Sequence, residues 1–237
     1  MSGDGRQRGV IRLGAGARSG SEVARTAEAR RKAETPQAGG RFSAAGRRPV
    51  ELTRSAPAAR ISGRGVMQVN LNWSAASEAD LDLGCMVRTR DGSGTAIQPL
   101  GEAFGSLTAW PYVSLDQDDR SGASSDGETL RISLEHRKKF SKLLVYVYVY
   151  EGAVDFRRLG GVVTVSAPEG AWRIHLDDSP PGATSCAIAL IAPGREGLDL
   201  RREGQWFTPH LYLGSQQQLD AAYGFDLAWG VGTKTPR

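Results

Sequence analysis

The sequence predicts an all-β protein, an antiparallel β-sandwich with a short C-terminal helix and a disordered N-terminal leader. After residue 50, apolar side chains recur at every second position in many short segments, which is the period of a half-buried strand. Turn-forming residues separate these segments. The first 49 residues are rich in Gly, Ala, Arg and Ser, and they have too few large apolar side chains to offset the entropy of ordering. We therefore expect a leader over residues 1–49 and one domain over residues 50–237.

The strands can be placed from this alternation. Within residues 67–73, Val69 and Leu71 alternate with Asn70 and Asn72, so one face is apolar and the other polar. The segment KLLVYVYVY is apolar on both faces, as expected of a central strand that is covered on both sides. Its three tyrosines share one face, where we expect a layer of core. The same pattern predicts strands at 67–73, 81–89, 129–135, 142–150, 160–167, 171–177 and 184–192, and a helix at 215–225.

Composition and charge limit the class of protein. Of the 237 residues, 40% are hydrophobic and 24% charged, which is ordinary for a soluble globular protein. The sequence has no apolar stretch of about 18 residues that could span a membrane. It also lacks an N-terminal apolar region of the signal-peptide type, so we expect a cytoplasmic protein. Cys85 and Cys186 form no CxxC motif, and we predict that both are reduced and buried.

The basic character of the chain belongs to its first quarter. The formal net charge is +4, but residues 1–60 hold 13 Lys and Arg against 5 Asp and Glu. The remaining residues are mildly acidic. A basic leader could contact nucleic acid or anionic lipid, or it could only aid solubility. We expect the second, and we predict no specific binding of nucleic acid by the domain.

Two groups of carboxylates are unusual for their density. Asp80 and Asp82 open a strand and, at i and i+2, share one face of it. The Gly- and Ser-rich segment 115–129 holds five more acidic residues. Carboxylates held close together repel unless a cation or a hydrogen-bond donor lies among them. Hard oxygen ligands from separate loops suit calcium, although the spacing does not fit an EF-hand. The residue types leave two interpretations open, a calcium site and a solvated acidic loop.

The order of several short motifs resembles that of a known family. VELTRSAPA, VNLNW, ADLDLG, QDDRSG and LLVYVYVYEG occur in this order, and they are similar to the TerD-like domain of the tellurium-resistance stress proteins, in particular to its TerA-like branch. The resemblance covers about residues 50–237. It implies a β-sandwich that binds calcium at its acidic loops. It also implies a role in bacterial stress response and tellurite resistance.

The resemblance implies specific metal ligands. The DLD motif of the family falls on Asp80 and Asp82. Its GDNLTG motif falls on QDDRSG, which assigns a ligand to Asp118 and places Asp119 where the family has Asn.

The acidic tail that follows in the family falls on ASSDGET. Asp126 and Glu128 are acidic there, whereas Ala123 and Ser125 occupy positions at which TerD proper has acids. Fewer charges should weaken calcium binding, so we expect one or two Ca²⁺ ions.

No pattern in the sequence predicts an enzyme. His136, His175 and His210 lie far apart and show no ligand spacing. The chain has no GxSxG elbow and no phosphate-binding GxxxxGK[ST] loop. No exposed thiol cluster is expected that could reduce an oxyanion, and no small-molecule substrate is evident. We therefore predict a non-enzymatic protein.

Two functions follow as hypotheses. In the first, calcium orders the acidic loop, and the ordered face docks a protein of the same stress system, or a membrane surface through the bound cation. In the second, the chain is a metal-free interaction scaffold with a solvated acidic loop. In this case the aromatic C-terminal region carries the contact, and exposed aromatic residues there would mark it.

Overall fold

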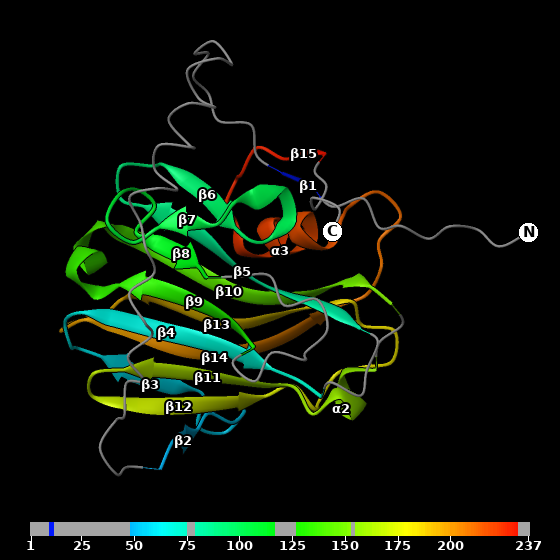
Figure 1. The fold of residues 1–237 in the computed structure, drawn as a ribbon, viewed down its shortest axis with the longest axis horizontal. Helices are drawn as coiled ribbons and strands as arrows, with labels where there is room; N and C mark the ends of the chain where they lie inside the picture. Colours follow the sequence, from blue (N-terminus) through cyan, green and yellow to red (C-terminus); the bar gives the residue numbers. More distant parts are fainter. Residues whose placement is uncertain (1–9, 12–47, 75–78, 117–126, 153–154, 232–237) are drawn as a thin grey trace, which may run out of the picture.

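Two β-sheets pack face to face in the computed structural model (Figure 1), which describes residues 10–11, 48–74, 79–116, 127–152 and 155–231. One sheet has six strands in the order β3-β14-β13-β10-β5-β6. Their bounds are β3 Ala58–Ile61, β14 Leu198–Phe207, β13 Ser185–Pro193, β10 Phe140–Glu151, β5 Asp80–Thr89 and β6 Gly94–Ile97. Every neighbouring pair in this sheet is antiparallel.

The other sheet has seven strands in the order β2-β12-β11-β4-β9-β8-β7. Its strands are antiparallel except for β2 and β12, which are parallel. Their bounds are β2 Val50–Glu51, β12 Gly170–His175, β11 Val162–Ala167, β4 Val66–Asn72, β9 Glu128–Ser133, β8 Val113–Leu115 and β7 Gly105–Ser106. A separate two-stranded ladder joins β1, Val10–Ile11, to β15, Gly230–Val231. The rest of the predicted leader, apart from its last two residues, lies outside the described residues.

The main core fills the space between the sheets. In β4, Met67, Val69 and Leu71 are fully buried, while the residues between them are half-buried on the outer side. In β5, residues 81, 83, 85 and 87 belong to the same core. Because successive side chains of a strand point to opposite faces, the even-numbered residues of β5 lie on the outer face of the six-stranded sheet.

Strand β10 is apolar on both faces, and both faces are covered. Its odd-numbered residues from 143 to 149 belong to the main core. Leu144, Tyr146 and Tyr148 belong to a second, smaller core on the outer face of the six-stranded sheet. The predicted tyrosine layer is therefore present, although Tyr150 is only half-buried.

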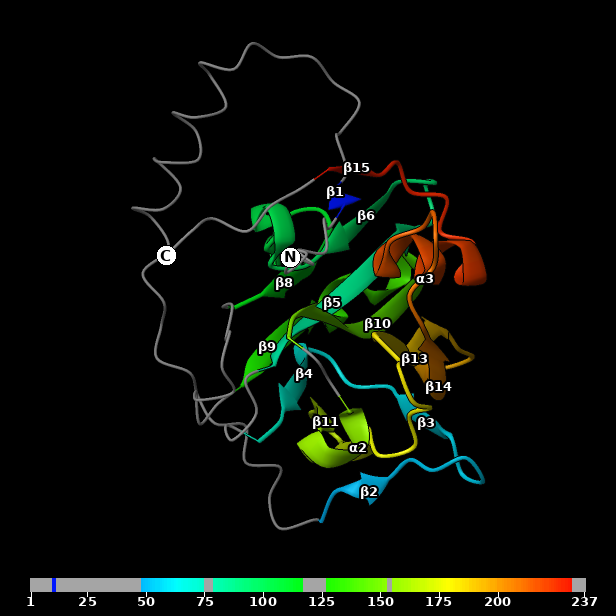
Figure 2. The ribbon, with the colours of Figure 1, turned by 90° about the vertical axis from the view of Figure 1, so that its right-hand side faces the viewer.

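Helix α3, Ser215–Tyr223, covers this second core (Figures 1 and 2). Figure 2 shows the two sheets edge-on, with α3 on the outer side of the six-stranded sheet. Leu219 and Phe225 are fully buried in the second core. Gly224 has a φ of 61°, and it ends the helix in the left-handed conformation that favours glycine. Lys142 of β10 donates a hydrogen bond to the Gly224 carbonyl at 2.7 Å.

The described residues include three further short helices. They are the 3₁₀ helices η1, Leu100–Glu102, and η2, Leu134–Lys139, and the one-turn helix α2, Phe156–Leu159. Within the described parts of the chain, no helix has the length and apolar character needed to cross a bilayer.

The predicted sandwich and C-terminal helix are confirmed, and each predicted strand is present within a few residues. Cys85 and Cys186 are free and buried, as expected. Six strands of the two sheets were not predicted. Five of them, β2, β3, β6, β7 and β8, are only two to four residues long. The sixth, β14, has ten residues but alternates only at its start, before the charged run of Arg201, Arg202 and Glu203.

Candidate functional site

The candidate site lies where β5 begins. Asp80 and Asp82 are 6% and 0% exposed. Both are even-numbered, so they share the outer face of the six-stranded sheet, as the i, i+2 spacing predicts. In the register with β10, Asp82 faces Tyr148 and Asp80 faces Glu151. Two adjacent carboxylates are therefore buried at one end of a central strand pair.

Tyr148 is the side chain that connects Asp82 to its surroundings. It is 3% exposed. The pKa of Tyr148 is raised well above 10, first by burial and then by the negative charge of Asp82, with further contributions from Tyr146 and from the charge of Glu128. The phenol therefore keeps its proton at any physiological pH. The charges of Asp82 and Glu128 both act on this one hydroxyl.

Glu128 joins the two sheets at this end of the sandwich. It is the first residue of β9 and is completely buried. Its Oε2 accepts a hydrogen bond from the backbone N–H of Leu83 at 2.6 Å. Strand β6 pairs with β5 only from Cys85 onward, so Leu83 lies beyond the end of that ladder. The Glu128 carboxylate of the seven-stranded sheet thus accepts a hydrogen bond from β5 at a point where β6 no longer pairs with it.

The residue before Glu128 explains how its side chain reaches β5. Gly127 has a φ of 60°, and a Cβ there would lie 2.1 Å from the carbonyl oxygen of Leu71. Only glycine fits a backbone that is left-handed and in such close contact. On the neighbouring strand, Asn70 donates hydrogen bonds to the side chain of Thr129 at 3.0 Å and to the Glu128 carbonyl at 3.4 Å. The start of β9 is therefore held firmly.

Asp116 has a different role. Its Oδ1 accepts a hydrogen bond from the Thr129 N–H at 3.0 Å, and its Oδ2 lies 3.1 Å from a guanidinium nitrogen of Arg131. The Asp116 N–H in turn donates to the Thr129 carbonyl at 3.1 Å. Asp116 therefore ties the two sides of the acidic segment together at its base, and its charge is balanced by an arginine.

The structure describes half of the predicted metal ligands. Asp80, Asp82 and Glu128 are described and lie at the same end of the sandwich, whereas Asp118, Asp119 and Asp126 lie outside the described residues. Among the residues that the structure describes, no group of three or more His, Cys, Asp or Glu is arranged to hold a metal ion. The described carboxylates alone therefore do not make a complete site.

The three histidines lie in separate places. His136 stacks on Tyr112, with ring centroids 4.1 Å apart. His175 lies 3.1 Å from a carboxylate oxygen of Glu51, and His210 belongs to the loop between β14 and α3. The sequence analysis found no ligand spacing between these histidines, and their positions agree with that.

Two features of this site were not recognised in the sequence. The contact of Tyr148 with Asp82 depends on the register between β5 and β10, and the contact of Glu128 with Leu83 depends on how the two sheets pack. Gly84 could have indicated a close packing contact, since it lies between Asp82 and Met86 on the face of β5 that meets the tyrosines. A Cβ on Gly84 would lie 2.3 Å from the ring of Tyr146, so the tyrosine ring occupies the space above it.

Comparisons with known proteins agree with this architecture. No family model matches the chain. The tellurium resistance protein TerA of Alcaligenes sp is 32% identical over 203 residues, which cover 78% of this chain and 58% of that protein. The chain thus spans little more than half the length of this relative.

Among solved structures, a homologue of the telluride resistance protein TerD from Streptomyces coelicolor A3(2) has the same fold, with a TM-score of 0.51 and 15% identity. The match covers 70% of this chain and all of that one. The chain is therefore similar in sequence to a tellurium-resistance protein, TerA, and shares its fold with a homologue of TerD.

Proposed function

We propose that the acidic end of the sandwich binds calcium and that the bound ion controls docking of a partner. The observation that carries this proposal is the burial of Asp82 and Glu128. These two carboxylates come from different sheets, are 0% exposed, and act on the same tyrosine. Together they bring hard oxygen ligands, of the kind that calcium prefers, to one end of the sandwich. Glu128 also closes the acidic segment that begins after Asp116.

The residues fit a calcium ion by their chemistry. Calcium takes about 6–8 oxygen ligands, mostly from carboxylates and carbonyls, in a flexible geometry. The described carboxylates supply too few, so further oxygens would have to come from the segment between Asp116 and Gly127. The proposed ligands are Asp80, Asp82, Asp118, Asp119, Asp126 and Glu128. Calcium would supply positive charge there, and the chain would supply a rigid base at the start of β5 and β9.

The role of the ion in this proposal is to order a surface. Without metal, the carboxylates repel one another, and the cation removes that repulsion. The ordered surface then binds a protein of a tellurite-resistance and stress-response system in the bacterial cytoplasm, or a membrane surface, without catalysis. The similarity to TerA supports the biological setting. It does not identify the partner, since the chain spans 58% of that relative.

A metal-free interaction scaffold is the second candidate, and one observation favours it. Leu211 and Tyr212, in the loop between β14 and α3, are 82% and 83% exposed. Exposed apolar residues in the aromatic C-terminal region are what this hypothesis predicts. They are equally compatible with a calcium-dependent partner, so metal binding decides between the two candidates.

Calorimetry of the metal-stripped full chain tests the calcium proposal. We expect saturable heat with calcium and none with magnesium. Because calcium would bind only the folded state, it should also raise the free energy of unfolding, by about 2.7 kcal/mol at about a hundredfold excess over Kd. Asp82→Asn should weaken calcium binding at least about tenfold and reduce this stabilisation.

Asp199→Asn is the matched control. It also removes one carboxylate, but on an exposed side chain near the start of β14, at the opposite end of the sandwich. We expect it to bind calcium like the parent chain. Absence of calcium heat in the parent, or an undiminished calcium-induced rise in the melting temperature of Asp82→Asn, would count against the proposal and favour the scaffold.

A further inference from the structure

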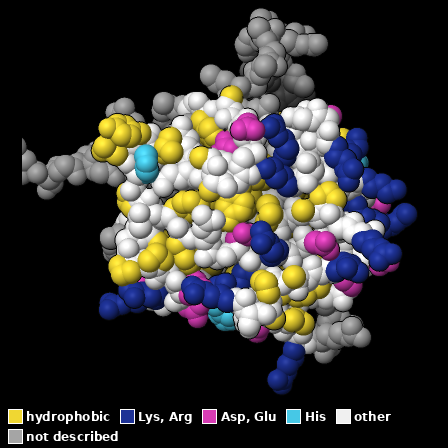
Figure 3. All heavy atoms as spheres, turned by 180° about the vertical axis from the view of Figure 1, so that it is seen from behind, with side chains coloured by type: hydrophobic (Ala, Val, Ile, Leu, Met, Phe, Trp, Pro, Cys, Tyr) yellow, Lys and Arg dark blue, Asp and Glu magenta, His cyan; other side chains and the backbone are white. Residues whose placement is uncertain are grey.

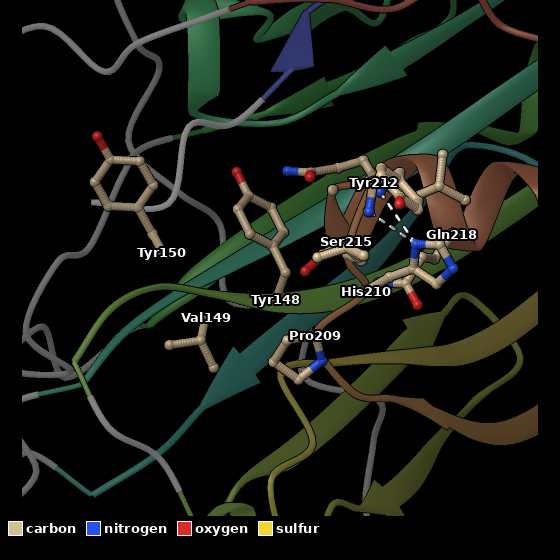
Figure 4. A pocket seen from close by; sticks show the side chains of 12 residues that line it. Tyr148, Val149, Tyr150, Pro209, His210, Tyr212, Ser215 and Gln218 are labelled. Atoms are coloured by element: carbon tan, nitrogen blue, oxygen red, sulfur yellow. Dashed lines mark hydrogen bonds between the residues drawn. The ribbon is translucent and has the colours of Figure 1, made fainter. Parts of the chain in front are cut away.

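A pocket of about 280 Å³ opens beside the acidic end, on the outer side of the six-stranded sheet (Figure 4). Tyr148 and Tyr150 of β10 form one side of it. Pro209 and His210 of the β14–α3 loop, and Ser215 at the start of α3, form the other side. Among the described residues, none of the side chains that line it is an Asp, Glu, Lys or Arg. Its affinity for a ligand must therefore come from hydrogen bonds and apolar contact.

The Gln216 amide is a buried donor in the lining of this pocket, and it has no acceptor among the described residues. Gln216 is 2% exposed, it lines the pocket, and its Nε2 makes no hydrogen bond to the described residues. A buried amide donor without an acceptor destabilises the folded state, because it has lost its hydrogen bonds to water. Turning this amide toward a ligand oxygen would break no existing hydrogen bond. Gln216 can therefore donate a hydrogen bond to a ligand in the pocket.

The start of α3 adds more donors at the same place. The N-terminal residue of a helix usually caps the first N–H groups with a side-chain oxygen, but the residue at this position is Gly214, which has none. The Oε1 of Gln217 accepts from the Gly214 N–H at 2.9 Å instead, and no side chain caps the first turn. Gly214, Ser215 and Gln216 all line the pocket. Uncapped N–H groups and the positive end of the helix dipole favour an anion.

His210, which also lines the pocket, has a defined tautomer. Its Nδ1 accepts hydrogen bonds from the N–H groups of Tyr212 and Leu213, each at 3.2 Å. The neutral imidazole must therefore carry its proton on Nε2. The same two bonds hold the turn that presents the exposed apolar residues, which form a yellow group at the upper left of Figure 3.

From these donors we infer that the pocket binds a small oxyanion, with its oxygens at Gln216 and the start of α3 and its remaining surface against the tyrosine rings. Phosphate, a carboxylate and tellurite share the required chemistry, because each presents charged oxygens and each is small enough for the volume. The inference concerns binding only, and no step of it oxidises or reduces the anion. It stands independently of the calcium site.

Calorimetric titration of the full chain with phosphate, acetate and tellurite tests this inference. Chloride at matched ionic strength is the control, and a chelator is present throughout, so that the outcome does not depend on calcium. We expect saturable binding of at least one oxyanion and none of chloride. The relative affinities then show which of the three the pocket prefers.

Two variants test whether the anion binds at the start of α3 and at Gln216. Gly214→Asp supplies a carboxylate cap to the first turn, and the backbone there (φ −67°, ψ 164°) accepts any residue. We expect it to weaken oxyanion binding at least about tenfold without lowering the melting temperature. Gln216→Glu should weaken binding similarly by repulsion. Gln68→Glu is the matched control, because it adds the same charge on β4, far from α3, and should bind normally.

Some results would overturn the inference. These are no saturable heat with any of the three oxyanions, or binding by a folded Gly214→Asp chain that equals that of the parent. If Gln216→Glu does not fold, Gly214→Asp still decides, because an N-terminal aspartate favours helix formation.

Discussion

The two sheets differ in what covers their outer faces. The outer face of the seven-stranded sheet carries polar side chains in register, with Asn70 opposite Thr164 and Gln68 opposite Ser166, all half-buried or more exposed. The outer face of the six-stranded sheet is covered by α3 and the segment after it, which build a second core. The fully buried members of that core include Met86, Leu144, Tyr146, Ala187, Leu219 and Phe225.

The difference teaches where a site can form in a sandwich. The outer face of the seven-stranded sheet is bare as far as the described residues go, so its half-buried polar groups meet water, which competes with any ligand. On the covered face, Asp80 and Asp82 lie beside a layer of tyrosines and are removed from water. Electrostatic interactions are stronger in such a low-dielectric setting. Both sites proposed above lie on this side or at its edge.

The largest expected effect on stability comes from truncating Phe225, which follows α3 and packs in the second core. Phe225→Ala should lower the free energy of unfolding by about 3–5 kcal/mol, because it deletes a fully buried ring from the second core. Thr164→Ala, on the bare face, should change it by less than about 0.5 kcal/mol. Urea unfolding of the two variants measures the contrast, and equal losses would contradict the idea that only one outer face carries a core.

A smaller effect is expected from filling the space under the tyrosine layer. Gly84→Ala forces a Cβ to within 2.3 Å of the buried Tyr146 ring, whose hydroxyl also donates to Gln98 at 2.8 Å. Overpacking of this kind costs about 1–3 kcal/mol. The matched variant Gly170→Ala is in the seven-stranded sheet, where the nearest atom to a new Cβ is 3.8 Å away. If thermal unfolding showed Gly84→Ala to be as harmless as Gly170→Ala, the tyrosine layer would be more loosely packed than described.

The smallest effect concerns Asp178, which contacts β14 of the six-stranded sheet, and it depends on pH. Asp178 accepts hydrogen bonds from Arg202 at 2.6 Å and from Trp206 at 2.9 Å, both in β14. Burial would raise the pKa of Asp178, but these hydrogen bonds and the charge of Arg202 outweigh it and lower the pKa below 3.8. The stabilisation is therefore present above pH 3.8 and is lost as the pH falls through the lowered pKa.

Asp178→Asn tests this contribution. At neutral pH we expect a loss of about 0.5–1 kcal/mol, since the carboxylate is partly exposed to solvent. The difference from the parent chain should shrink on acidification, which unfolding curves at several pH values would show. A difference that stayed constant down to the lowest pH would mean that the charge of Asp178 is not what matters.

Much of the fold could be predicted from local pattern, because alternation and turn residues are properties of short segments. The helix was predicted to end at 225 and ends at 223, where Gly224 is the better signal. Strand β14 could not be predicted in this way. It pairs with β3 only through residues 198–201. Beyond them no described strand lies on that side, and the apolar and polar residues of β14 do not alternate there.

The site was predictable only in part. The spacing of Asp80 and Asp82 placed them on one face, because this follows from strand geometry alone. The burial of Glu128 against Leu83 depends on the packing of one sheet on the other, and the position of Tyr148 depends on the register between β5 and β10. The pocket at the start of α3 depends on a loop of irregular backbone, for which a sequence pattern carries no signal.

Strand β10 gives the protein one more property. Alternate residues along its length belong to different cores, so neither core can open without exposing one face of the same backbone. The two cores are thus a single cooperative unit. Amide protons in the middle of β10 should exchange with solvent only through global unfolding.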